Sequence, residues 1–451
     1  MMRTLVMVAA GVSLLGCATP QPYPTLETAG PQIEVGSLAF TGVDGNLYAA
    51  LAGATELVRL TDGASASTPE LSYSGYVWAD GELVYTTQEA TADGAVSASM
   101  YAVRPGERSR LLYTQDGLAP FFLNASPDGA RVGYLGSEAG RPGFVMGSVE
   151  LATGATVVHG RGQPFYAAWA PGGNALLTHV GLPGSEGGSL LALQRADASG
   201  TLERPRPLDL ATGPFQTPDY APDGSRIAVV LSEGDSAGIH ILDERGDDLG
   251  RLVGLQGSAA SLAWSPAGNR IAYLDGITTQ IGALVGRLFV VRFGADRPRL
   301  VSEAAIAHFW SPDGTKLLYF EPVVLGSAQG ETLGYRVGMY SLLSGDSQVL
   351  ATMLPARAFA QQIIPFVDQY ERTATIWSSD SRLVALNSRS VTGQPVIHLV
   401  DTETLRAGDT FRVSFTPAQA APSGELGLLP AEGVETRALA FGSIPFFARG
   451  R

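Results

Sequence analysis

A tight turn between two apolar stretches recurs along the chain, and it constrains the fold more than any other feature of the sequence. The clearest copy spans Phe309–Tyr319 and contains the turn Ser-Pro-Asp-Gly. Proline sets its own φ angle, aspartate can accept a hydrogen bond from its own backbone, and glycine tolerates positive φ. The apolar run Leu317–Tyr319 after the turn is typical of a buried strand. Each copy therefore predicts two strands joined by a tight turn.

The copies return at a regular interval. Further full copies lie at 124–134, 169–177, 220–228 and 264–273, with a weaker copy at 377–384 and a shortened one at 78–85. Successive prolines of the five full copies are 44, 51, 44 and 46 positions apart. A period in the mid-forties with short strands is the signature of a four-stranded propeller blade, whereas a β-sandwich does not repeat one motif at one period. The sequence therefore predicts an all-β fold, a β-propeller of four-stranded blades.

This pattern resembles the TolB-type, WD40-like propeller repeat. It is also similar to the propeller that precedes the hydrolase domain in dipeptidyl-peptidase-type enzymes. The resemblance covers roughly residues 36–451, although the Trp-Asp ending of true WD40 blades is absent and no stretch is left for a hydrolase domain. It implies that the turn residues are structural and that the partners of this propeller are proteins.

The strand pattern gives the number of blades. We divide the chain into the units 36–61, 77–114, 121–158, 165–210, 215–253, 260–301, 307–350 and 375 to about 414. These units predict eight blades, with seven as the alternative. The first unit lacks its innermost strand, which Thr436–Phe441 can supply. We therefore expect the ring to close by mixing N- and C-terminal strands, which removes free sheet edges.

Residues 33–451 are expected to form a single propeller domain with an insertion at about 354–372. Within the insertion, Ala356–Ile364 predicts one or two helical turns that Pro365 would end. Long loops on rigid scaffolds often carry function. The alternative is that the insertion covers one blade edge.

Residues 1–16 have the pattern of a bacterial lipoprotein signal peptide. Arg3 precedes the apolar run Leu5–Leu15, and Leu14-Leu15-Gly16-Cys17 matches a lipobox. Cys17 would then carry the lipid, including palmitate, and residues 17–32 would form a Pro-rich linker. The alternative is an ordinary secretory signal with an incidental cysteine. We expect a cell-envelope location, on the periplasmic side of the outer membrane if the organism is Gram-negative, because Ala18 rather than Asp follows the cysteine.

Charge and cysteine content exclude some functions. The formal net charge is −13, so the chain lacks the basic surface that nucleic-acid binding requires. A negatively charged protein is not attracted to anionic lipid headgroups, so attachment to the membrane is expected to depend on the lipid on Cys17. Cys17 is the only cysteine, so an intramolecular disulfide is not expected.

No motif predicts a catalytic, cofactor-binding or metal-binding residue. Gly234–Gly238 matches the nucleophile elbow of hydrolases, but a strand rather than a helix follows it. The acidic loop Asp243–Asp248 lacks the spacing of a calcium loop, and Gly181–Gly188 lacks the lysine of a phosphate loop. The histidines show no zinc-ligand spacing, although different blades could bring them together; they are His159, His179, His240, His308 and His398.

These observations predict a non-catalytic, lipid-anchored propeller that acts as a monomer and binds an envelope protein or peptide. Propellers bind through the loops of one face and the mouth of the central channel. One alternative is an enzyme with an active site at the channel mouth, such as a lyase, lactonase or glycan hydrolase. Another is a carbohydrate-binding module, which would need exposed aromatic residues on one face. Four tyrosines could serve there, although the sequence cannot place them; they are Tyr76, Tyr166, Tyr220 and Tyr370.

Overall fold

The computed structural model describes residues 36–64, 73–90, 96–181, 189–197, 200–278, 284–295, 297–327, 330–373, 375–403 and 427–449. The predicted signal peptide, Cys17 and the predicted linker lie outside these ranges. Within them, no helix combines the length and the apolar character needed to cross a bilayer.

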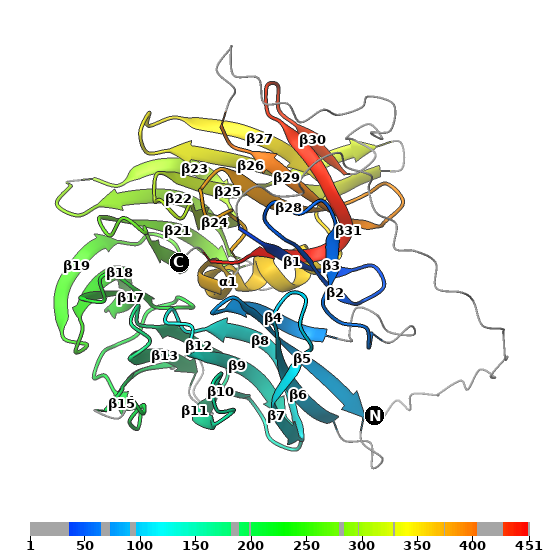
Figure 1. Ribbon diagram of the computed structural model, residues 1–451. Coiled ribbons are helices and arrows are strands. Elements are labelled where there is room, and N and C mark those ends of the chain that lie inside the picture. The colour runs from blue at the N-terminus through cyan, green and yellow to red at the C-terminus, as the bar shows by residue number, and fades with distance from the viewer. Residues whose placement is uncertain are drawn as a thin grey trace, which may run out of the picture.

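The strands form seven hydrogen-bonded sheets arranged around a central axis (Figure 1). Five sheets have four strands each, with the first strand of each nearest the axis. In chain order they are β4 (Tyr73–Ala79), β5 (Glu82–Ala90), β6 (Val96–Val103) and β7 (Arg110–Asp116); β8 (Leu118–Ala125), β9 (Arg131–Glu138), β10 (Phe144–Glu150) and β11 (Thr156–Gly162); β12 (Phe165–Trp169), β13 (Ala175–Gly181), β14 (Ser189–Arg195) and β15 (Arg206–Pro207); β16 (Asp219–Tyr220), β17 (Arg226–Glu233), β18 (Ser236–Asp243) and β19 (Asp248–Gly254); and β20 (Ala259–Trp264), β21 (Arg270–Thr278), β22 (Leu284–Arg292) and β23 (Arg299–Ala305).

The other two sheets are larger. One has five strands: β24 (Ala307–Trp310), β25 (Lys316–Ser327), β26 (Gly330–Ser341), β27 (Ser347–Met353) and β30 (Leu428–Pro430). The other has six strands in the spatial order β28 (Leu383–Arg389), β29 (Pro395–Asp401), β31 (Thr436–Phe447), β1 (Leu38–Gly42), β2 (Leu47–Ala50) and β3 (Leu57–Arg59).

The predicted turn chemistry is confirmed. Asp313 accepts a hydrogen bond from the Thr315 backbone N–H at 3.0 Å, and the Ser311 hydroxyl donates to the same carboxylate at 2.6 Å. Gly314 adopts a φ of 67°, which side chains rarely tolerate. The aspartates of the turns at 124–134 and 220–228 accept the same local hydrogen bond. The turns are therefore structural, as the repeat implied.

Two tryptophans of the repeat form hydrogen bonds to the inner strand of the preceding sheet. The indole N–H of Trp310 donates to the Ala263 carbonyl at 3.2 Å, and that of Trp377 donates to the Phe309 carbonyl at 3.2 Å. These buried N–H groups therefore have a partner on the preceding sheet, which gives the repeat both packing area and a directed contact.

The six-stranded sheet closes the ring. Within β31, residues 436–441 pair with β29 and residues 442–447 pair with β1, so N- and C-terminal strands share one sheet as predicted. The units 36–61 and 375–414 are consequently joined through β31. The propeller has seven blades, the alternative, and the count of eight was wrong because it treated these two units as separate sheets. Thr436–Phe441, predicted to pair with the first unit, instead pairs with β29.

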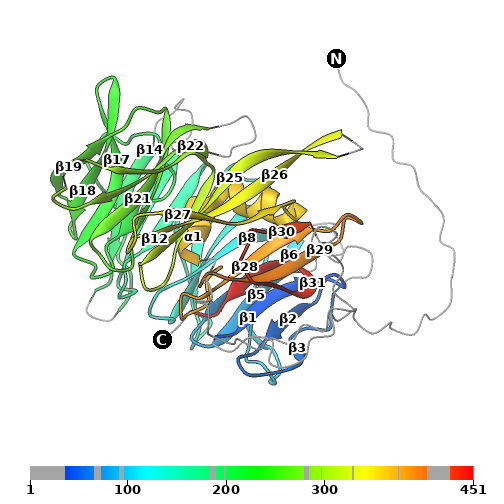
Figure 2. The same ribbon diagram turned by 90° about the horizontal axis from the view of Figure 1, so that it is seen from above.

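The segment predicted to be an insertion enters the central channel. Three of the other links from an outer strand to the next inner strand have only one or two residues, such as Gly117 between β7 and β8. After β27 the chain instead forms the π-helix η2 (Phe359–Ile363), the 3₁₀ helix η3 (Ile364–Phe366) and the helix α1 (Val367–Thr373). Figures 1 and 2 show α1 in the middle of the ring, so the insertion does not cover a blade edge.

Pro365 does not end this helical segment, contrary to the prediction. It lies at the start of η3, where a proline removes no needed backbone hydrogen bond, and the chain stays helical to Thr373. The segment is fixed by buried apolar side chains, among them Phe359, which is 3% exposed. Phe359 packs against Phe320 and Tyr335 with ring centroids 5.4 and 6.4 Å away.

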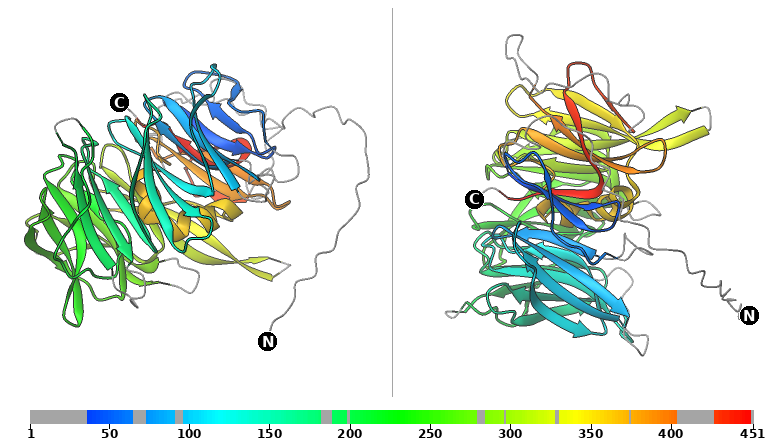
Figure 3. Two further views of the ribbon diagram at one scale, coloured as in Figure 1. Left: turned by 90° about the horizontal axis from the view of Figure 1, so that it is seen from below. Right: turned by 45° about the vertical axis from the view of Figure 1, so that its right-hand side comes forward.

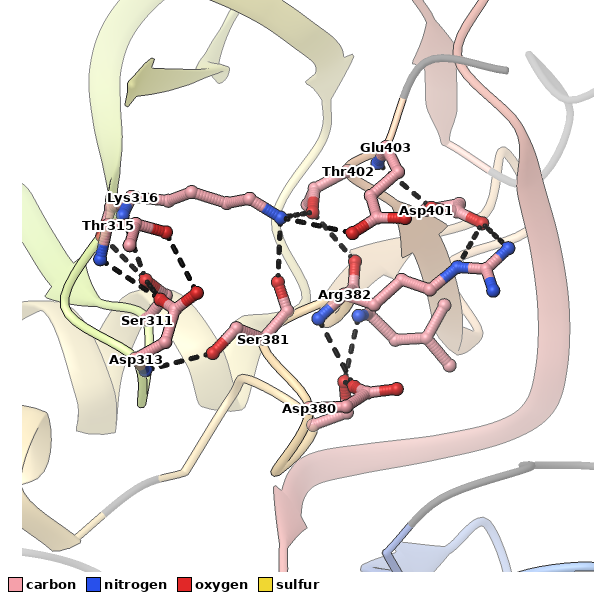
Figure 4. A network of polar contacts seen from close by, with 12 residues as sticks. Ser311, Asp313, Thr315, Lys316, Asp380, Ser381, Arg382, Asp401, Thr402 and Glu403 are labelled. Atoms are coloured by element: carbon pink, nitrogen blue, oxygen red, sulfur yellow. Dashed lines mark hydrogen bonds and ion pairs between the residues drawn. The ribbon is translucent and has the colours of Figure 1, made fainter. Parts of the chain in front are cut away.

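A polar network joins the five-stranded and six-stranded sheets near the repeated turn (Figure 4). Lys316, the only lysine of the chain, donates from Nζ to the Ser381 carbonyl at 2.9 Å and to Thr402 Oγ1 at 3.1 Å. The Asp313 backbone N–H donates to Ser381 Oγ at 3.0 Å. The lysine side chain is 17% exposed, and Glu403 lies 3.9 Å from Nζ. One cation thus connects the turn regions of two blades.

Candidate ligand cavity at the channel mouth

A cavity of about 1190 Å³ lies between the insertion and the inner strands of three neighbouring blades. Its walls come from β4, β8, β12, the insertion and the bend of β31. Residues at the ends of strands farther from the axis, including Gln88, Phe144, Arg389 and Pro395, form its outer part.

All of these residues lie at the blade ends remote from the repeated turns. Tyr73 and Phe165 begin their strands, whereas the Ser-Pro-Asp-Gly turns follow the strand ends, and Arg389 is the last residue of β28. The cavity therefore occupies one mouth of the channel, with the insertion forming one wall.

Aromatic rings make up much of the wall. Phe121 and Phe144 meet edge to face at 5.0 Å, and Tyr370 of α1 meets Phe122 edge to face at 5.1 Å. Phe121 is 39% exposed and Phe366 of the insertion is 45% exposed, which is unusual for phenylalanine. Phe121 and Phe366 therefore offer an exposed apolar surface to a ligand.

The polar groups of the wall are mainly amides and guanidinium groups. The lining glutamines are Gln88, Gln163, Gln361, Gln362, Gln369 and Gln394, and the lining cations are Arg357 and Arg389. Among the described lining residues there is no aspartate, glutamate or histidine. The described wall therefore supplies hydrogen-bonding and stacking groups, but not the ionisable pair that general acid–base catalysis uses.

Three of the four tyrosines that the sequence could not place line this cavity. Burial raises the pKa of Tyr76 and of Tyr370, and burial, with the Asp368 carboxylate, raises the pKa of Tyr166 to about 12. The Tyr76 hydroxyl donates to the Ile444 carbonyl. These tyrosines therefore remain neutral hydrogen-bonding groups at physiological pH. Tyr220 is buried in β16 and is not part of the wall.

The insertion is tied to the channel wall by amide groups. The Gln369 side chain donates to the Phe165 carbonyl at 3.3 Å, and the Gln216 side chain donates to the Pro365 carbonyl at 3.4 Å. The first contact reaches the inner strand β12 and the second reaches the link that precedes β16, and both partners are distant in sequence from the helical residues. The wall formed by the insertion is therefore fixed in place.

The sequence motifs that were considered as possible catalytic or ion-binding sites do not line the cavity, and their described residues make structural contacts. Ser236 of the elbow-like stretch begins β18 in a tight hairpin, and its hydroxyl donates to the Glu233 carbonyl at 3.1 Å. In the acidic loop, Asp243 accepts backbone N–H groups of Arg245 and Asp247 at 2.8 and 2.9 Å. Residues 182–188 of the Gly-rich stretch lie outside the described ranges.

The five histidines belong to five different sheets, in β11, β13, β18, β24 and β29. His240 is held between Asp248 and Glu233, at 3.0 and 2.9 Å, on a strand remote from the cavity. In the part of the chain that the structure describes, no group of three His, Cys, Asp or Glu side chains is arranged to hold a metal ion.

No protein-family model and no curated protein sequence matches the chain. Solved structures that resemble it include TolB from Acinetobacter baumannii, which is 14% identical over 81% of this chain and 82% of that chain, with a TM-score of 0.38. Oligogalacturonate lyase in complex with manganese is 15% identical over 81% and 97%, with a TM-score of 0.46. A putative 6-phosphogluconolactonase from Bacteroides uniformis ATCC 8492 is 12% identical over 92% and 100%, with a TM-score of 0.40.

These proteins have different names and activities, and identities of this size concern the fold alone. The β-propeller predicted from the repeated turn is confirmed, and TolB propellers are among the structures that resemble it.

Proposed function

We propose that this protein is a non-catalytic propeller of the cell envelope, anchored by a lipid on Cys17, which binds a peptide segment of a partner protein in the cavity at the channel mouth. The observation that carries the proposal is the wall itself, which combines aromatic rings with amides and whose described residues include no carboxylate or histidine. Such a wall suits binding better than acid–base chemistry.

A second feature on the same face favours a macromolecular partner. Strands β25 and β26 are longer than the corresponding strands of the other blades, and Figures 2 and 3 show their hairpin projecting beyond its neighbours. The hairpin extends at the blade ends where the cavity opens, away from the repeated turn. Val324 and Leu333 are cross-strand partners on it and are 66% and 53% exposed. A ligand confined to the cavity would leave this apolar pair uncovered.

Site-specific photo-crosslinking in intact cells tests the proposal. A benzophenone amino acid replaces Phe366 in the cavity, Val324 on the hairpin or, as a control, the exposed Leu249 on the remote strand β19. We expect the same partner protein to be joined to the first two positions but not to the third, and to be lost in Cys17→Ser. Equal labelling at all three positions, or none at the cavity, would contradict a binding site there.

A further inference from the structure

The cavity carries a charge preference that defines its ligand more narrowly, and this inference rests on the proposed function. We propose that the bound peptide presents a carboxylate, from an acidic side chain or from its C-terminus, to Arg357 and Arg389. Both guanidinium groups belong to cavity-lining residues, and both residues are exposed.

The fold places these two arginines on adjoining segments of backbone. The Arg389 N–H donates to the Leu354 carbonyl at 2.8 Å, and the Ala356 N–H donates to the Asn387 carbonyl at 3.0 Å. The start of the insertion is thus paired with the end of β28. This pairing fixes the backbone that carries both cations at one part of the cavity rim.

The surroundings leave these cations available to a ligand. The protein has a net charge of −13, yet no described residue of the cavity wall is acidic. Other arginines are held by carboxylates, as Arg161 is by Glu138 at 2.8 Å and Arg382 is by Asp401 at 2.7 Å. Among the described residues neither cavity arginine has such an ion pair.

Arg357 is already oriented by a neutral neighbour. Its Nε donates to Gln361 Oε1 at 3.0 Å, which leaves the terminal amino groups of the guanidinium to bind a ligand. Guanidinium groups bind carboxylates through paired hydrogen bonds in a fixed planar geometry. Two of them beside an apolar wall therefore favour a ligand that has a carboxylate next to apolar groups.

The rest of the wall favours a peptide over a sugar or an acyl chain. Six of the lining aromatic residues are phenylalanines, which offer no hydrogen bond to sugar hydroxyls. The glutamine amides both donate and accept, as a peptide backbone does, and an acyl chain would leave them unpaired. The volume of about 1190 Å³ exceeds that of an ordinary small-molecule site, so it accommodates several residues.

Peptide selection on the full chain, purified in detergent, tests the preference. A random peptide library with free C-termini is selected on the immobilised protein, and binders are resynthesised with Asp and Glu changed to Asn and Gln and the C-terminus amidated. We expect neutralisation to weaken binding by about tenfold or more, measured by fluorescence polarisation. The double variant Arg357→Gln/Arg389→Gln should bind the charged peptide more weakly by the same factor, and should bind the neutral peptide with unchanged affinity.

Two variants keep the outcomes distinct. Arg108→Gln removes an exposed arginine outside the cavity and should leave the affinity unchanged, whereas Phe366→Ala should weaken every cavity binder. Peptides that depend on Phe366 but not on charge, or that bind the double arginine variant equally well, would overturn the carboxylate preference and leave the proposed function standing. A selection that yields no Phe366-dependent peptide would overturn both.

Discussion

The contact of Lys316 with two blades predicts a measurable loss of stability when the ammonium group is removed. Lys316→Met keeps most of the apolar stem and deletes hydrogen bonds of 2.9 and 3.1 Å to Ser381 and Thr402. A hydrogen bond from a charged group contributes about 1.5–3 kcal/mol. This contribution is partly offset, because the ammonium is only 17% exposed in the fold and regains its full hydration on unfolding.

We therefore expect Lys316→Met to lower the free energy of unfolding by about 2 kcal/mol. Glu403 contributes little to this, because it is 62% exposed and 3.9 Å from Nζ, and Glu403→Gln should cost less than about 1 kcal/mol. A double-mutant cycle between Lys316→Met and Thr402→Val should show coupling of about 1 kcal/mol. The assay is urea unfolding at neutral pH, with the midpoint compared at an unchanged denaturant slope.

A matched control is Arg336→Met, which removes a cation from the same sheet. Arg336 is half exposed and pairs with Glu321 at 3.3 Å within its own blade, so its loss should cost less than about 1 kcal/mol. The reasoning fails if Lys316→Met matches the wild type within about 0.5 kcal/mol, or if Glu403→Gln costs as much as Lys316→Met.

The remaining predictions concern the insertion, a buried histidine and the anchor. Phe359→Ala should destabilise the protein by about 3–5 kcal/mol in urea unfolding because this ring is 3% exposed, whereas Phe366→Ala should cost less than about 1 kcal/mol; similar costs would show that the insertion is not packed as described. Burial lowers the pKa of His159 to about 4, so the unfolded chain binds this proton more readily between about pH 6.5 and 4. Stability should fall as the pH decreases through that window, and His159→Gln should remove up to about 3 kcal/mol of the fall; an unchanged pH profile would contradict this. Cys17→Ser should move the protein from the detergent-rich to the aqueous phase of a partitioning assay, and unaltered partitioning would exclude the lipid anchor.

The local structure of the repeated turns could be predicted from sequence because it depends only on residues within each turn. Proline, aspartate and glycine specify the turn wherever they follow one another, and Asp313 and Gly314 behave as their chemistry requires. The number of blades could not be predicted from the repeated turn. It depends on β31 pairing with both β29 and β1, which is a contact between distant segments that no local pattern encodes.

The candidate site could be predicted only in pieces. The extra length at 354–372 indicated an insertion, but its position inside the channel depends on contacts such as that of Phe359 with Phe320. The cavity combines residues of β4, β8, β12, β28 and β31, and their convergence follows from the ring rather than from spacing along the chain. The clustering of Tyr76, Tyr166 and Tyr370 could not be deduced from sequence for the same reason.

The single lysine described between two blades also determines which reagents can report on this protein. Amine-directed crosslinkers and labels find one side-chain target in the sequence, and it is largely covered and engaged in hydrogen bonds. Partner capture must therefore use photochemical or carboxyl-directed chemistry. A protease that cleaves only after lysine has one site in the chain, at the start of β25, and can cut there only when that turn opens. Cleavage at Lys316 is thus a built-in reporter of the separation of these two blades.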